Sequence, residues 1–149
     1  MIDTIRAVVV LSLVATVGDA QARAVDDALA HYMVLLKSSP PDSTAAFYTA
    51  DGQLLEPGMA PLTGPAAIRA FLEPIVRTVT VSEATATPEA TEVYGDSTGY
   101  QWGRYHQVAG PTGTPPTTYE GRFVVEWRKT PAGWRIVRFL VQPNPPPRQ

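Results

Sequence analysis

Apolar residues along this chain recur first at helical spacing and then at strand spacing. Between residues 25 and 37 they return every three or four positions, which predicts a helix with one buried face. A proline pair ends this pattern, and a capped short helix is expected at residues 42–48. Pro65 then opens a further apolar helix that ends near residue 76. The first half of the chain is therefore predicted to be mainly helical.

The second half changes to the period of two that is typical of strands. Thr, Val and aromatic residues alternate with polar ones, and Gly or Pro turns separate the segments. A short strand at residues 53–57 is expected after a turn at Ala50-Asp51-Gly52. The longer pattern predicts strands at residues 78–87, 91–94, 98–108, 117–129 and 134–142. Helices followed by a meander of strands predict an α+β domain with an antiparallel sheet and helices on one of its faces.

The N-terminal segment has the features of a secretory signal peptide. Residues 7–17 are an apolar run of eleven, and Ala20-Gln21-Ala22 fits a small-residue cleavage site. The run is too short for a permanent membrane span. We expect a signal peptide at residues 1–22, a folded domain at 23–143 and a frayed proline-rich tail at 144–149. The alternative is a buried N-terminal helix. A processed chain would be secreted or periplasmic, with no membrane partner.

The composition excludes several kinds of partner and functional site. The chain has 149 residues, enough for one domain, and a net charge of −2 without a basic run, which argues against nucleic acid as a partner. It has no cysteine, so a disulfide, a thiolate nucleophile and a Cys-ligated metal are excluded. Two histidines are too few for a His-based metal site. We therefore expect neither a metal nor a cofactor.

One stretch carries a family resemblance. Phe47-Tyr48 is followed by Asp51 and Pro57, and then by Thr63-Gly64, Ala67-Ile68-Arg69 and Phe71-Leu72. This pattern resembles the NTF2-like superfamily, in particular its SnoaL-like and DUF4440-type members, over about residues 24–143. The resemblance implies a cystatin-like cone, in which a strongly curved sheet wraps around the N-terminal helices. The superfamily contains isomerases, cyclases, hydrolases and binding domains, so the fold does not name an activity.

Glu56 and Tyr32 are the candidate catalytic pair. In the ketosteroid-isomerase branch, a tyrosine of the first helix donates to the developing enolate and a carboxylate just before a proline moves the proton. Tyr32 and Glu56-Pro57 resemble both positions. In that chemistry, burial in an apolar pocket has to raise the pKa of the Glu56 carboxyl. The alternatives are a Glu56 ion pair with Arg69 or Arg104, and a Tyr32 that only packs in the core.

The strand at residues 98–108 offers candidate ligand contacts. Alternation places an aromatic pair, a cation and an imidazole on one face, at Tyr100, Trp102, Arg104 and His106. If that face points into the cone, it lines a small-molecule pocket. The alternative is that the aromatic pair is core and the polar pair lies at the rim.

These observations support three interpretations. The first is a secreted NTF2-like domain that binds a small, mostly apolar molecule in its cone. The second is a cofactor-free isomerase or cyclase with Glu56 as general base and Tyr32 as donor. The third is an interaction module with a vestigial pocket. Because helices cover only one face of the sheet, we also expect a homodimer through the other face.

Overall fold

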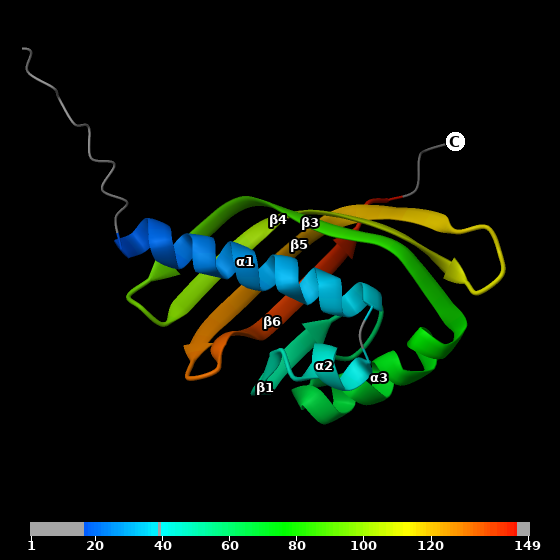
Figure 1. Ribbon diagram of the computed structural model, residues 1–149, viewed down its shortest axis with the longest axis horizontal. Coiled ribbons are helices and arrows are strands. Elements are labelled where there is room, and N and C mark those ends of the chain that lie inside the picture. Colours follow the sequence, from blue (N-terminus) through cyan, green and yellow to red (C-terminus); the bar gives the residue numbers. More distant parts are fainter. Residues whose placement is uncertain (1–16, 39, 146–149) are drawn as a thin grey trace, which may run out of the picture.

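Three helices and six strands make up residues 17–38 and 40–145, the part of the chain that the computed structural model describes. Helix α1 (Val17–Ser38) lies across one face of a curved sheet, as Figure 1 shows. The short helix α2 (Pro41–Ala45) and helix α3 (Gly64–Thr78) pack together at one end of the sheet. No helix in the described ranges combines the length and apolar character that a bilayer-spanning segment needs.

The sheet is mixed, with the strand order β2-β1-β6-β5-β4-β3. Its strands are β1 (Tyr48–Leu55), β2 (Leu62–Thr63), β3 (Val79–Tyr94), β4 (Thr98–Pro111), β5 (Thr117–Thr130) and β6 (Gly133–Pro143). The α+β class and the helix-covered curved sheet are confirmed, but the sheet is not wholly antiparallel. Strand β1 runs parallel to β6, because the long segment between them returns the chain in the same direction.

Strand β1 contains the residues predicted to form a turn. Ala50, Asp51 and Gly52 lie within β1, and the register against β6 shifts between Tyr48 and Gln53. A Cβ atom at position 52 would lie 2.8 Å from the carbonyl oxygen of Ile136. The turn prediction was therefore wrong, because this glycine permits close backbone contact at a bulge instead of a reversal.

Other elements are longer or shorter than the pattern predicts. The two segments predicted at residues 78–87 and 91–94 are one strand, β3, with a register shift between Pro88 and Ala90. Because β3 lies at the edge of the sheet, Pro88 interrupts the pairing without ending the strand. Strand β4 continues to Pro111, α2 ends at Ala45, and α1 begins at Val17. Most of the predicted signal peptide, residues 1–16, lies outside the described residues.

The core lies between α1 and the concave face of the sheet. Val25, Leu29 and Tyr32 are buried at helical spacing on α1, and β5 contributes the buried residues Phe123 and Trp127. Burying this apolar stripe stabilises the helix far more than its own propensity does.

A buried polar network holds α1 in register with the sheet. The side-chain amide of Gln101 on β4 donates to the Asp26 carboxylate on α1 at 2.8 Å. Thr91 on β3 donates to the same carboxylate, and the Trp127 indole on β5 donates to the Gln101 side-chain oxygen at 3.1 Å. Gln101 is fully buried, so these hydrogen bonds satisfy groups that water does not reach. The network fixes which residues of α1 face the cavity.

Candidate functional site

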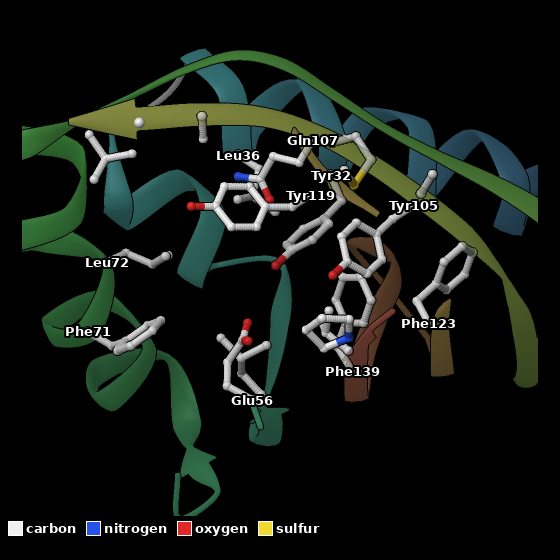
Figure 2. Close-up of a pocket in the computed structure, with 18 of the residues that line it drawn as sticks. Tyr32, Leu36, Glu56, Phe71, Leu72, Tyr105, Gln107, Tyr119, Phe123 and Phe139 are labelled. Atoms are coloured by element: carbon white, nitrogen blue, oxygen red, sulfur yellow. The ribbon is translucent and has the colours of Figure 1, made fainter. Parts of the chain in front are cut away.

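A cavity of about 540 Å³ opens between α1, α3, the end of β1 and the concave face of the sheet. Its walls are mostly apolar, with Leu36, Phe71, Leu72, Phe123 and Phe139 among them (Figure 2). The polar groups that line it are Tyr32, Glu56, Tyr105, Gln107 and Tyr119. An apolar cavity with a few polar groups is the usual form of a small-molecule site.

Tyr32 lies in the wall of this cavity on the buried face of α1. Its side chain is only 2% exposed, and its ring packs 5.3 Å from the ring of Phe139. Its hydroxyl lies 2.8 Å from the hydroxyl of Tyr48. Burial raises the pKa of Tyr32 well above its ordinary value, so the phenol stays protonated and is a stable hydrogen-bond donor.

Tyr48 supports Tyr32 from the start of β1. Burial raises the pKa of Tyr48, and the nearby Tyr32 raises it further. For Tyr32, the hydrogen bond with Tyr48 acts in the opposite direction and lowers the pKa. Either hydroxyl can donate in this contact, so Tyr48 can hold the Tyr32 hydroxyl in place whichever of the two donates. This contact could not be predicted from local patterns, because it joins α1 to β1 across 16 positions of the chain.

Glu56 follows the last residue of β1 and extends its carboxylate into the cavity. Figure 2 shows this carboxylate and the hydroxyls of Tyr32 and Tyr105 directed toward the same part of the cavity. The group is partly buried, and that burial raises its pKa above the ordinary glutamate value. A partly buried carboxyl with a raised pKa is typical of groups that accept and return a proton in catalysis.

The sequence allowed an ion pair of Glu56 with Arg69 or with Arg104, and the described residues form neither. Arg69 lies 3.5 Å from Asp42, and Arg104 lies 3.1 Å from Glu89. Both arginines are thus paired elsewhere, and burial dominates the electrostatics of Glu56. The alternative of a loop-anchoring salt bridge is therefore wrong for this carboxylate.

Tyr105 on β4 supplies a second phenol that the sequence did not single out. Burial raises its pKa first, and the negative charge of Glu56 raises it further. Its cross-strand neighbour is Gly121, where a Cβ atom would lie 2.7 Å from the Tyr105 ring and 2.2 Å from the Gln142 carbonyl oxygen. Glycine at this position leaves room for the ring beside the backbone.

The residues of β4 that the sequence predicted to contact a ligand lie on the face that points away from the cavity. Gln101 is buried against α1, so alternation turns Tyr105, Gln107 and Ala109 toward the cavity. The set that the sequence proposed does not line the cavity: Tyr100, Trp102, Arg104 and His106. The expectation that this face points into the cone is not met. Both faces of β4 carry aromatic residues, so composition did not reveal the direction.

Arg104 and His106 lie instead in a polar groove on the outer face. The two ring nitrogens of His106 lie 3.3 Å from Glu83 and 3.3 Å from Glu120, on the neighbouring strands. Arg104 and Arg122 both pair with Glu89. These exposed groups neutralise one another across the sheet and contribute little to stability.

The cavity has the elements of an acid/base site. One carboxyl with a raised pKa faces two protonated phenols, and aromatic and aliphatic walls limit the access of water. In the described ranges, no group of three or more His, Asp or Glu side chains is placed to hold a metal ion.

Comparison with known proteins agrees with this architecture. The family model described as the SnoaL-like domain matches residues 20–139. The chain therefore belongs to the SnoaL-like family, within the NTF2-like superfamily, and the predicted resemblance is confirmed. No curated protein matches the chain.

Solved structures share the fold at low sequence identity. A ketosteroid isomerase-like protein from Erwinia carotovora atroseptica is 17% identical, with a TM-score of 0.73 over 85% of this chain and 98% of that one. A candidate scytalone dehydratase from Novosphingobium aromaticivorans is 15% identical, with a TM-score of 0.74 over 85% of each chain. An NTF2-like protein with a cystatin-like fold, from the same organism, is 23% identical, with a TM-score of 0.63 over 82% of this chain and 80% of that one. These similarities establish the fold alone.

Proposed function

We propose that the protein binds a small, mostly apolar carbonyl compound in its cavity and catalyses a cofactor-free isomerisation or cyclisation. Glu56 is the general base and Tyr32 the hydrogen-bond donor. The observation that carries this proposal is the Glu56 carboxylate, which lines an apolar cavity together with Tyr32 and has no cationic partner among the described residues. Of the interpretations that the sequence allows, this geometry favours the enzyme over a purely binding domain.

The proposed reaction conserves its protons. The Glu56 carboxylate takes a proton from the carbon beside the substrate carbonyl, and the C–H electron pair moves into an enolate. The Tyr32 hydroxyl donates a hydrogen bond to the enolate oxygen, with Tyr48 donating to Tyr32 behind it. In a β,γ-unsaturated substrate the enolate is conjugated with the C=C bond. The protonated Glu56 then returns the proton to the γ-carbon, the double bond moves to the α,β position and the carbonyl re-forms, which completes an isomerisation.

A second donor to the enolate is available in Tyr105. In the ketosteroid-isomerase branch, a protonated carboxylic acid in the late part of the sheet is a further donor, and the residues of this chain at that position, 123–125, are apolar. Phe123 is buried and lines the cavity. The Tyr105 hydroxyl points toward the same space as that of Tyr32 (Figure 2). We therefore assign Tyr105 the role of a neutral donor that partly replaces the missing acid. Two neutral phenols would stabilise an enolate less than a phenol and a carboxylic acid.

The test uses exchange of α-protons in deuterium oxide. We expect the wild-type protein to accelerate exchange at the α-carbons of 2-tetralone, followed by proton NMR. Glu56→Gln should abolish the acceleration, because the amide does not accept the proton. Tyr32→Phe should slow exchange by about 10²–10³-fold, the usual cost of removing one oxyanion donor. Glu83→Gln, at an exposed carboxylate on β3, is the matched control and should leave the rate unchanged.

Binding without exchange would contradict the catalytic assignment. If 2-tetralone shifts the resonances of cavity residues but its α-protons exchange at the buffer rate, the protein is a binding domain. Equal rates for the wild type and Glu56→Gln would remove Glu56 from the mechanism.

Secretion or a periplasmic location remains a separate proposal that rests on residues 7–22 of the sequence.

A further inference from the structure

A second space of about 580 Å³ adjoins the cavity, between the end of α1, α3 and the start of β3. We call it the outer chamber; the residues that line it alone are Lys37, Ser38, Ile75, Val76, Thr80 and Val81. The residues that line both spaces are Leu36, Glu56, Phe71, Leu72, Val79 and Gln107. Several of these shared residues surround the Glu56 side of the cavity in Figure 2.

Six residues line both spaces, so the two spaces lie next to each other around Glu56. Each space alone has the volume of an ordinary small-molecule pocket, roughly 300–1,000 Å³. Glu56 lines both spaces and therefore lies at the boundary between them. A ligand that fills both spaces therefore extends past Glu56 in both directions.

The outer chamber has a single cationic group in its lining, Lys37 in the last turn of α1. Its side chain is exposed, and no carboxylate of the described residues lies within ion-pairing distance of its ammonium. The other side chains that line this chamber alone are hydroxyl or aliphatic. The chamber thus has a mixed lining of aliphatic, aromatic and polar side chains, in which Lys37 is the cation and Glu56, shared with the inner cavity, is the carboxylate.

The two charged groups of the combined site fix a direction for the ligand. An ionised Glu56 repels an anionic group from the boundary between the two spaces, and Lys37, which lines only the outer chamber, attracts that group there. The phenols of Tyr32 and Tyr105 favour a neutral oxygen at the inner end. A molecule with an anion at one end and a neutral apolar body matches both ends of the site.

We propose that the natural ligand is an elongated, mostly apolar monocarboxylic acid. Its carboxylate binds Lys37 in the outer chamber, and its apolar body passes Glu56 into the inner cavity. This inference rests on the proposed function, because it names the class of substrate that the same site accepts. Lys37 is then a specificity-determining residue that does not touch the reacting atoms.

The test compares two fluorescent probes of equal length. The first is 11-(dansylamino)undecanoic acid, and the second is its methyl ester, which lacks the negative charge. We expect Lys37→Met to weaken binding of the acid about three- to fivefold, in line with an exposed ion pair, and to leave binding of the ester unchanged. Lys37→Arg should retain the affinity for the acid. Lys129→Met, at the only other lysine of the chain, is the matched control and should change neither affinity.

The outcomes separate the two claims. Binding of the ester with no effect of Lys37→Met on the acid would overturn the assignment of the outer chamber and leave the proposed function standing. An equal loss for acid and ester would also overturn it, since Lys37 would then only support the fold. If neither probe binds the wild-type protein, both the inference and the proposed small-molecule site fail.

Discussion

At the scale of single residues, Glu56 is the group whose surroundings matter most. It lies at the end of β1, where Leu54 is buried and Pro57 turns the chain away. Burial raises its pKa because the charged form loses hydration that the apolar walls do not replace. The folded protein therefore binds a proton at Glu56 more readily than the unfolded chain does.

This linkage gives a pH-dependent prediction for Glu56→Gln. Because the folded-state pKa is raised, the stabilising contribution of Glu56 is complete below its unfolded pKa and is lost as pH rises through the folded value. At pH 7 the ionised carboxylate thus costs stability that a glutamine does not. We expect a higher Tm for the variant than for the wild type at pH 7, and a difference that shrinks as the solution is acidified. A variant that is less stable at pH 7 by the same calorimetry would contradict a desolvated Glu56.

Tyr48→Phe tests the support of Tyr32. The substitution keeps the ring that packs on Tyr32 at 5.9 Å but removes the hydroxyl that bonds it at 2.8 Å. A hydrogen bond of this kind contributes about 0.5–1.5 kcal/mol, so exchange of 2-tetralone protons should slow by up to about tenfold. Tyr32→Phe should have the larger effect, because it removes the donor itself. If Tyr48→Phe exchanges as fast as the wild type, the two tyrosines do not act together.

At the scale of the elements, the crossing of α1 over the sheet positions the site. The network from Asp26 through Gln101 to Trp127 joins α1 to β4 and β5 at one point, and Tyr32 lies on α1 beyond it. A slip of this helix would move the Tyr32 hydroxyl away from both Tyr48 and the cavity. The polar network thus contributes to the register of the site as well as to stability.

Gln101→Leu is the direct test of that network. Gln101 accepts a hydrogen bond from the Trp127 indole and donates one to the Asp26 carboxylate, and a leucine would remove both bonds. An unsatisfied buried group costs about 1–3 kcal/mol, so the free energy of unfolding in urea should fall by that amount. The control is Gln142→Leu, at an exposed position on β6, for which we expect little change. Equal stability of both variants would show that the network is not a source of stability.

Periodicity predicted where most helices and strands lie, but not which face of each strand points into the cavity. The three-and-four spacing on α1 and the alternation on β4 and β5 are properties of the local chain, so they are visible in the sequence. Alternation showed that Tyr105 and Gln107 share a face opposite Trp102, but not which face meets α1. That choice depends on Gln101 reaching Asp26, a contact between distant parts of the chain. Glu56 and Tyr32 were found through the family resemblance, whereas Tyr48 and Tyr105 required the structure.

At the scale of the whole molecule, no helix of the described residues covers the outer face of the sheet. Trp102, Val124 and Leu140 are register neighbours across β4, β5 and β6, and the last two are 46% and 41% exposed. Ion pairs flank this row, among them Arg138 with Glu126. An apolar centre with a charged rim is the usual pattern of a protein interface.

We predict that this face forms a homodimer. A stable interface would bury about 1,200–2,000 Å² in total. Val124→Arg should convert the dimer to a monomer in light scattering at micromolar concentration, because it places a charge at the centre of the apolar row. Val34→Arg, at an exposed position on α1, is the control and should leave the mass unchanged. A wild-type protein that is monomeric at high micromolar concentration would refute the dimer.

The central claim is that Glu56 is a desolvated carboxyl poised for proton transfer, and an NMR titration tests it most directly. The measurement follows the side-chain carboxyl carbon of Glu56 in ¹³C-labelled protein, assigned with Glu56→Gln, from acidic to neutral pH. We predict a pKa clearly above that of an unperturbed glutamate, since burial is the cause of the shift and no cation of the described residues pairs with the group. A Glu56 pKa at or below the ordinary glutamate value would mean that the carboxylate is hydrated or paired, and would contradict its role as the general base.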